Sequence, residues 1–129
     1  MIAVDTNVLV RLLTGDEPEQ ARRSGELFAR NQVFIPKTVV LETEWVLRYA
    51  YGFEPEAIVS GFRNLFGLAN VNVEDLPAVK QALDWHAQGF DFADGLHLAS
   101  STSARQFATF DRALVKAAKR IGASKVVTV

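Results

Sequence analysis

Close to its start the chain reads Ile2-Ala3-Val4-Asp5-Thr6-Asn7, and this stretch decides the predicted fold. Its three apolar residues indicate a short buried strand. Asp5 follows at the position where a helix is capped, since its side chain can accept a hydrogen bond from the first turn. The same layout recurs at Thr109-Phe110-Asp111-Arg112, so two strands of the chain each end on an Asp that opens a helix.

The rest of the chain extends this alternation of short strands and helices. Further strands are predicted at residues 33–35, 70–73, 107–110 and 125–129. Helices are predicted at residues 8–13, from Pro18, and at 39–50, 55–66, 75–88, 90–103 and 111–120, with Thr38 and Asp75 as caps of two of them. Short apolar strands separated by helices predict a three-layer α/β/α fold around a parallel sheet of about 4–5 strands. Residues 1–129 are expected to form one domain.

Composition excludes several classes of protein. The chain has 129 residues and no cysteine, which rules out disulfide scaffolds, iron–sulfur centres and thiol nucleophiles. Its net charge of −1 gives no overall attraction to nucleic acid, so any polyanion site must be a local patch. No apolar run reaches the roughly 18–20 residues of a membrane span, and the first residues lack the pattern of a signal peptide. A soluble cytoplasmic protein is therefore expected.

Acidic residues fall where a parallel sheet places ligands. Asp5 and Asp111 end two strands, Glu42 lies on the helix after strand 33–35, and Asp91 and Asp94 lie at the start of the 90–103 helix. In open parallel sheets, ligands bind at the carboxyl edge of the strands. We therefore expect acids from four separate segments to reach one rim of the sheet. For any single Asp, an ordinary helix cap is the alternative explanation.

The sequence also favours one of two neighbouring glutamates. Glu44 has Arg48 four residues later, the orientation of an exposed ion pair on a helix. Glu42 has no such partner and shares a helical stripe with Trp45 and Tyr49. We therefore predict that Glu44 is the surface acid and that Glu42 points at a site.

Carboxylates that lie close together repel each other, and they must take up protons or hold a cation. Hard oxygen ligands select Mg²⁺ or Mn²⁺. A metal in such a site lowers the pKa of its bound water and favours attack on a phosphodiester. The predicted chemistry is metal-assisted hydrolysis.

At these residues the chain resembles the PIN-domain ribonucleases, and among them the VapC-type toxins of bacterial toxin–antitoxin pairs. The resemblance covers essentially the whole chain. It rests on four motifs in order, which are Val4-Asp5-Thr6-Asn7-Val8-Leu9, Leu41-Glu42-Thr43-Glu44-Trp45-Val46-Leu47, Asp91-Phe92-Ala93-Asp94-Gly95-Leu96-His97-Leu98-Ala99 and Thr109-Phe110-Asp111.

The resemblance implies roles for the matching positions. Asp5, Glu42, Asp94 and Asp111 match the metal-binding acids of the family. The resemblance implies supporting roles for polar residues at or near these acids, which are Thr6, Asn7, Thr109 and Asp91. Asp91 matches an acid that only part of the family has. The resemblance also implies cleavage of RNA (a tRNA, rRNA or mRNA) with Mg²⁺ or Mn²⁺, and a VapB-like antitoxin as partner. The apolar content of helices 39–50 and 55–66 adds a candidate homodimer face.

Two other functions remain open at this stage. One is a non-catalytic PIN-like module that binds RNA or protein. The other is an aspartyl-phosphate receiver or phosphatase, but the phosphatase pattern needs a second Asp where this chain has Asn7, and a receiver needs a Lys after a late strand, whereas Lys125 precedes the last one.

The basic residues and histidines can be explained by structural roles as well as by functional ones. Arg11 and Arg112 are the cations predicted to lie nearest the acids and to contact RNA. Two further clusters, Arg22/Arg23/Arg30 and Arg112/Lys116/Lys119/Arg120, could hold an RNA backbone or be solvated helix faces. His97 is interpreted as a hydrogen-bonded helix residue and His86 as a surface residue.

Overall fold

A computed structural model describes all 129 residues, which form seven helices and five short strands in two compact units, Met1–Leu76 and Pro77–Val129. The helices are α1 (Thr6–Thr14), α2 (Pro18–Arg30), α3 (Lys37–Tyr49), α4 (Pro55–Phe66), α5 (Leu76–Ala87), α6 (Phe92–Ala99) and α7 (Arg112–Arg120). The strands are β1 (Ile2–Ala3), β2 (Val33–Ile35), β3 (Val71–Val73), β4 (Phe107–Thr109) and β5 (Val126–Thr128).

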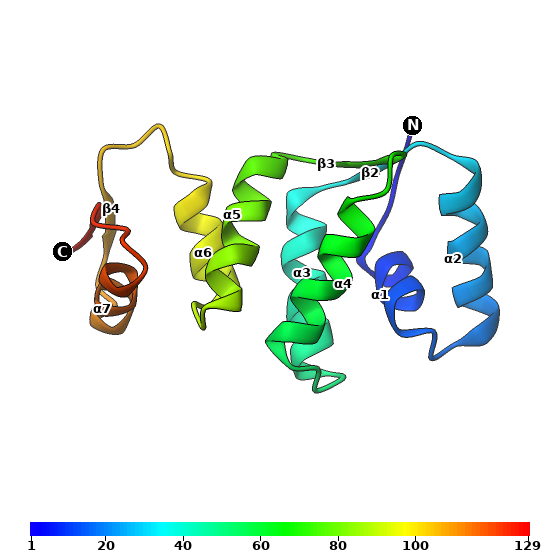
Figure 1. The fold of residues 1–129 in the computed structure, drawn as a ribbon, viewed down its shortest axis with the longest axis horizontal. Helices are drawn as coiled ribbons and strands as arrows, with labels where there is room; N and C mark the ends of the chain where they lie inside the picture. Colours follow the sequence, from blue (N-terminus) through cyan, green and yellow to red (C-terminus); the bar gives the residue numbers. More distant parts are fainter. The chain divides into compact units, whose positions relative to one another are not determined.

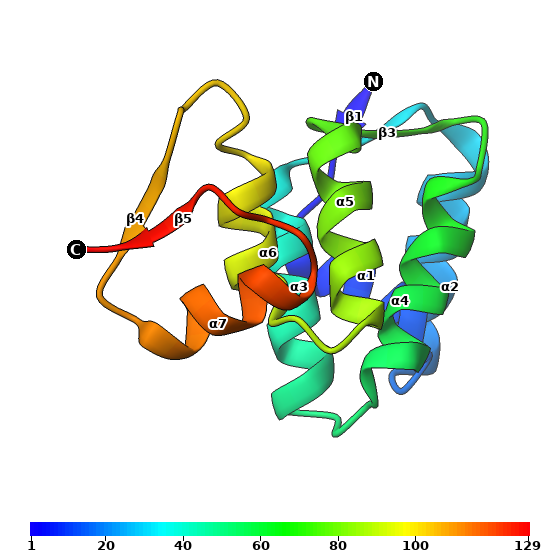
Figure 2. The same cartoon turned by 60° about the vertical axis from the view of Figure 1, so that its left-hand side comes forward.

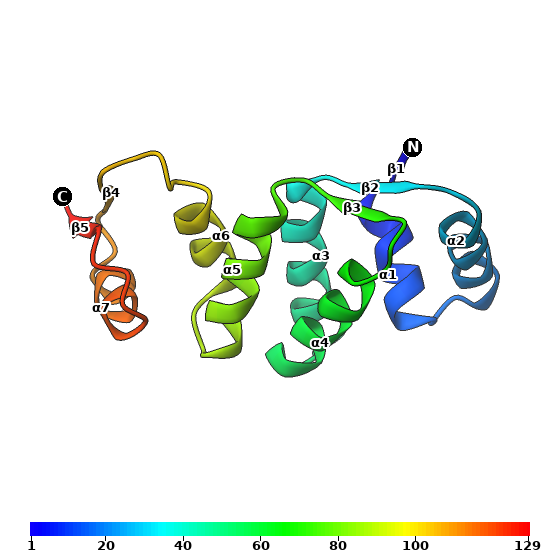
Figure 3. The same ribbon diagram turned by 45° about the horizontal axis from the view of Figure 1, so that its top comes forward.

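The first unit is built on a parallel three-stranded sheet in the order β1-β2-β3. Ile2 pairs with Val33, and Val33 pairs with Val71 on the other side. The strands lie at one end of helices α1 to α4 (Figures 1 and 3). Because β1 and β2 run in parallel, the helices that follow them, α1 and α3, start from the same edge of the sheet.

The second unit contains a parallel pair, β4 and β5, in which Phe107 is opposite Val126 (Figure 2). Helix α7 connects these two strands, as expected for a parallel crossover. The side of α7 that faces inward, with Leu114 and Ala118, packs into an apolar cluster with Phe90, Leu98 and Val126. This packing fixes the start of α7 at the end of β4.

Local sequence signals account for several helix ends. Pro18 and Pro55 occupy the first turns of α2 and α4, where the missing N–H costs no hydrogen bond. Gly15 ends α1 in the left-handed conformation at φ 67°, and its N–H donates to the carbonyl of Arg11. These signals placed most helices correctly within a few residues.

Some predicted boundaries and caps are wrong. Helix α6 ends at Ala99 rather than extending to residue 103, and the Lys125 ammonium donates to the carbonyls of Ser101 and Ala104 in the turn that follows. Thr38 lies inside α3, which begins after Pro36 with no side-chain cap. Asp75 has a positive φ of 52° and forms an ion pair with Lys37.

Helix α3 packs inward on the side that carries Glu44, which the sequence predicted to be exposed. Its buried residues are Val40, Thr43, Glu44 and Leu47, a repeat of three and four residues that buries the two aliphatic side chains. Trp45 and Tyr49 therefore lie outside, 54% and 66% exposed. The rings of Trp45 and Tyr49 contact each other at a tilt of 37°, with their centroids 5.1 Å apart.

The helices have a further property in common. Each of them is too short or too polar to cross a lipid bilayer.

Candidate active site

The first unit brings together Asp5, Thr6 and Glu42. Asp5 precedes α1 in extended conformation, and its Oδ1 accepts a hydrogen bond of 2.7 Å from the backbone N–H of Thr6. Thr6 is buried, and its hydroxyl donates to Oε1 of Glu42 on α3. The parallel pairing of β1 and β2 creates this contact, because it starts α1 and α3 at the same sheet edge.

The second unit holds the remaining acids at the starts of two helices. Asp91 caps α6, and its Oδ2 accepts from the backbone N–H of Asp94 at 3.0 Å. Asp111 caps α7, and its Oδ1 accepts from the N–H of Leu114 at 3.1 Å. The hydroxyl of Thr109 in turn accepts from the N–H of Asp111 at 3.0 Å, so β4 fixes the position of this acid.

Electrostatics single out Asp94. Its partial burial is the main cause that raises the pKa of its carboxyl, and the carboxylates of Asp91 and Asp111 raise this pKa further. The electrostatic effect of His97 lowers the pKa of Asp94. Asp94 therefore lies in a field created by two other acids of the same unit, and this field disfavours its charged form.

Capping and metal binding are compatible at these residues. Asp5, Asp91 and Asp111 each use one carboxylate oxygen for a backbone N–H, and the second oxygen accepts no hydrogen bond from the protein. Such oxygens are the ligands that Mg²⁺ and Mn²⁺ prefer. Neither unit by itself gathers three or more His, Cys, Asp or Glu side chains into a metal cluster. Each unit therefore contains carboxylates of a kind that such ions bind, Asp5 and Glu42 in the first unit and Asp94 and Asp111 in the second.

The prediction for Glu44 is wrong. Glu44 is only 1% exposed, although its predicted partner is correct: the Arg48 guanidinium donates to its Oε2 at 2.8 Å. Glu42 is exposed and contacts Thr6, so it does point at another candidate residue. Helical spacing identified the ion pair, but it could not show that this pair lies on the inner side of α3.

His86 also differs from its prediction as a surface residue. It is buried, its Nδ1 lies 2.8 Å from the carbonyl of Phe90, and its ring meets the Phe92 ring edge-on. His97, one turn after Asp94, is exposed.

The two predicted RNA-contacting arginines have different environments. Arg11 is held by Asp16, Gln20 and Tyr51, at 3.1, 2.8 and 3.0 Å. Sequence reasoning missed this network, because Tyr51 lies 40 residues away and no helical pattern connects the two. Arg112 is exposed at the start of α7 and has no ion-pair partner.

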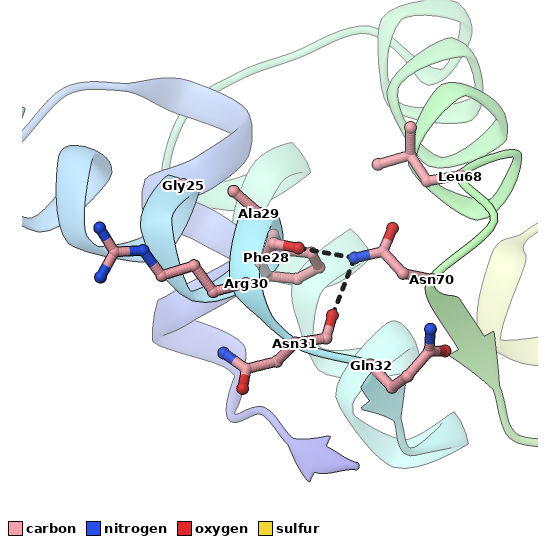
Figure 4. Close-up of a pocket in the computed structure, with 8 residues that line it drawn as sticks. All are labelled: Gly25, Phe28, Ala29, Arg30, Asn31, Gln32, Leu68 and Asn70. Atoms are coloured by element: carbon pink, nitrogen blue, oxygen red, sulfur yellow. Dashed lines mark hydrogen bonds between the residues drawn. The ribbon is translucent and has the colours of Figure 1, made fainter.

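Two shallow pockets lie in the first unit. One is between α1 and α2, beside the candidate residue Asn7, and includes Arg11, Arg23 and Ser24 in its lining. The other lies at the end of α2, where Asn70 donates to the carbonyls of Phe28 and Asn31 (Figure 4). In the second pocket the Asn70 amide satisfies carbonyls at a helix end, which is a structural role.

Comparison with known protein families gives a match over nearly the whole chain. No curated protein matches the chain. The PIN domain family matches residues 2–120, a span that includes all four motifs and residues of both units. The family has the predicted α/β/α fold with short parallel strands, and its members are generally nucleases that use divalent metals. With nearly its whole length matched, this chain belongs to the PIN domain family.

Proposed function

We propose that the protein is a metal-dependent endoribonuclease that hydrolyses RNA phosphodiester bonds with Mg²⁺ or Mn²⁺. Asp5, Glu42, Asp94 and Asp111 are its catalytic, metal-binding carboxylates in this proposal. The nuclease-type fold of the family supports the reaction class. The observation that supports catalysis most directly is that every acidic motif position holds its acid, and that each capping Asp keeps one carboxylate oxygen without a protein donor.

Each neighbouring residue has a positioning role in this proposal. The Thr6 hydroxyl orients Glu42, the backbone N–H of Thr6 fixes one oxygen of Asp5, and Thr109 fixes the backbone at Asp111. Asp91 fixes the start of α6 one turn before Asp94. A bound divalent ion supplies a water of lowered pKa and stabilises charge on the phosphate.

Asp5→Asn tests this proposal. The purified protein is incubated with structured RNA and Mg²⁺, with Asp75→Asn as the matched control, because Asp75 is exposed and Asn tolerates a positive φ as Asp does. We expect Asp5→Asn to lower the cleavage rate by at least about a hundredfold, since it removes a ligand of the ion that would stabilise charge on the phosphate. EDTA should abolish wild-type cleavage, and added Mg²⁺ or Mn²⁺ should restore it.

Equal cleavage by the wild-type protein and Asp5→Asn would contradict the assignment. A wild-type protein that binds RNA without cutting it, with no change in affinity on adding Mg²⁺, would instead indicate the non-catalytic binding module.

Thr6→Val tests the positioning of Glu42. The substitution removes a hydroxyl and keeps the side-chain shape, so the buried site stays filled. Loss of a group that orients a metal ligand costs about 10- to 100-fold in activity or metal affinity. Steady-state cleavage at several Mg²⁺ concentrations measures both quantities. Thr38→Val, at an exposed position of α3, is the control; an effect of equal size there would show that Thr6 has no special role.

The biological role belongs to the same proposal: a cytoplasmic toxin of the VapC type, silenced by a VapB-like antitoxin and active as a homodimer. The exposed aromatic pair Trp45 and Tyr49 on α3 supports a protein-covered surface there. The apolar residues of α4, by contrast, are buried, which restricts this candidate face to α3. A small neighbouring reading frame with a DNA-binding N-terminus would support the toxin role.

A further inference from the structure

Helix α7 has an exposed row of cations. Its nine residues include four basic side chains and no acidic one, and all four are exposed: Arg112, Lys116, Lys119 and Arg120. Arg112, Lys116 and Arg120 are spaced by four residues, which places them on one face at intervals of about 6 Å along the helix axis. This basic row begins at the residue after Asp111.

No carboxylate neutralises the basic row, whereas four other cations of the chain form ion pairs. Arg11 pairs with Asp16, Arg22 with Glu19 and Glu26, Lys37 with Asp75, and Arg48 with Glu44. No ion pair involves a side chain of the basic row. Like charges without partners on one helix repel each other and lower its stability. A bound anion would offset this repulsion, so the arrangement favours a binding role.

The opposite side of α7 limits what can bind. Leu114 and Ala118 are buried in the apolar cluster of the second unit, so α7 cannot insert an apolar face into a lipid surface. What α7 offers to solvent is a line of positive charge on a fixed helix. A linear polyanion matches this surface in charge and in shape.

We propose that the basic row binds the phosphodiester backbone of the RNA strand next to the bond cleaved at Asp111. This inference rests on the proposed function and assigns the positioning of its substrate to α7. Cations without base-reading geometry contact phosphates regardless of sequence, so the row contributes affinity and register rather than specificity.

The test is the triple variant Lys116→Gln/Lys119→Gln/Arg120→Gln, which leaves Arg112 beside Asp111 unchanged. The matched control is Arg63→Gln/Lys80→Gln/Arg105→Gln, which removes three exposed cations from α4, α5 and the segment before β4. Binding of a labelled single-stranded oligoribonucleotide is measured in EDTA by fluorescence anisotropy at several salt concentrations. Far-UV circular dichroism confirms that both variants fold.

We expect the triple variant to bind RNA roughly tenfold more weakly at low salt and to reduce the slope of log K against log salt by about 2, because each phosphate contact contributes about 0.7. The control should retain both values. In the cleavage assay the triple variant should raise KM and leave kcat close to wild type.

Equal losses in the triple variant and the control would overturn the proposal, as would wild-type affinity in the triple variant. Loss of binding to anionic phospholipid vesicles with unchanged RNA binding would assign the row to a membrane surface and also overturn it. A wild-type protein that binds RNA through the row but cleaves none would contradict the proposed nuclease function and leave the basic row supported.

Discussion

Asp94→Asn is expected to abolish RNA cleavage and, at neutral pH, to raise the melting temperature by roughly a few degrees. Cleavage is lost because the carboxylate proposed to hold the metal is gone, and the fall should be about a hundredfold or more. Stability rises because burial and the carboxylates of Asp91 and Asp111 raise the pKa of Asp94 and disfavour its charged form. The gain is small, because Asp94 is only partly buried and solvent screens its charge.

The raised pKa of Asp94 also determines how the stability difference between the wild-type protein and Asp94→Asn changes with pH. Below the ordinary Asp pKa of about 4, Asp94 is protonated in the folded and unfolded chain, so the wild-type protein and Asp94→Asn should melt alike. As the pH rises through the raised pKa of the folded state, the wild-type protein acquires the disfavoured charge and loses stability relative to the variant.

Differential scanning fluorimetry from acidic to neutral pH, with and without Mg²⁺, measures this prediction. Added Mg²⁺ should raise the melting temperature of the wild-type protein more than that of Asp94→Asn. A ligand that binds the folded state stabilises it, and the variant lacks one of the carboxylates proposed to hold the ion. Asp75→Asn serves as the control. A variant that cleaves RNA normally, or that melts below the wild type at neutral pH, would contradict the assigned role.

Glu44→Ala is expected to produce the largest loss of stability among the acidic residues. Glu44 is 1% exposed and forms an ion pair with Arg48, so its removal leaves a cavity and takes the carboxylate partner from a half-buried guanidinium. Breaking a fully buried pair costs about 3–5 kcal/mol. We expect about 2–3 kcal/mol here, because Arg48 is 30% exposed.

Glu42→Gln is the matched comparison two residues away on the same helix. It should leave the urea midpoint close to wild type and reduce RNA cleavage, whereas Glu44→Ala should lower the midpoint and leave the activity of the folded fraction intact. Urea titration followed by circular dichroism, together with cleavage at low temperature, separates the two effects. Similar stability losses in both variants would contradict the division of roles between Glu42 and Glu44.

Much of the fold follows from local sequence signals. Apolar runs of three residues identified β1 and β2. Pro18, Pro55 and Gly15 identified helix ends, because Pro fits the first turn of a helix and Gly adopts the left-handed conformation that ends one. The caps at Asp5, Asp91 and Asp111 were also visible, since an Asp before a helical pattern has a local mechanism.

What local signals could not provide was the side of a helix that packs inward. Helix α3 has two stripes at helical spacing, one with Trp45 and Tyr49 and one with Val40 and Leu47. Only tertiary packing decides between them, and here it buries the aliphatic stripe together with Glu44. The meeting of all four acids at one rim spans both units and stays a prediction.

Each capping Asp uses only one of its two carboxylate oxygens to begin a helix, and this has a practical consequence. An amide can still accept the backbone hydrogen bond that begins a helix, and Asn is as good a cap as Asp. Asp5→Asn or Asp111→Asn therefore removes the negative charge and preserves the hydrogen bond that begins α1 or α7. A variant of this kind should keep its native helix starts and lack the proposed nuclease activity, so it can be used to trap intact RNA or to co-purify whatever binds the chain.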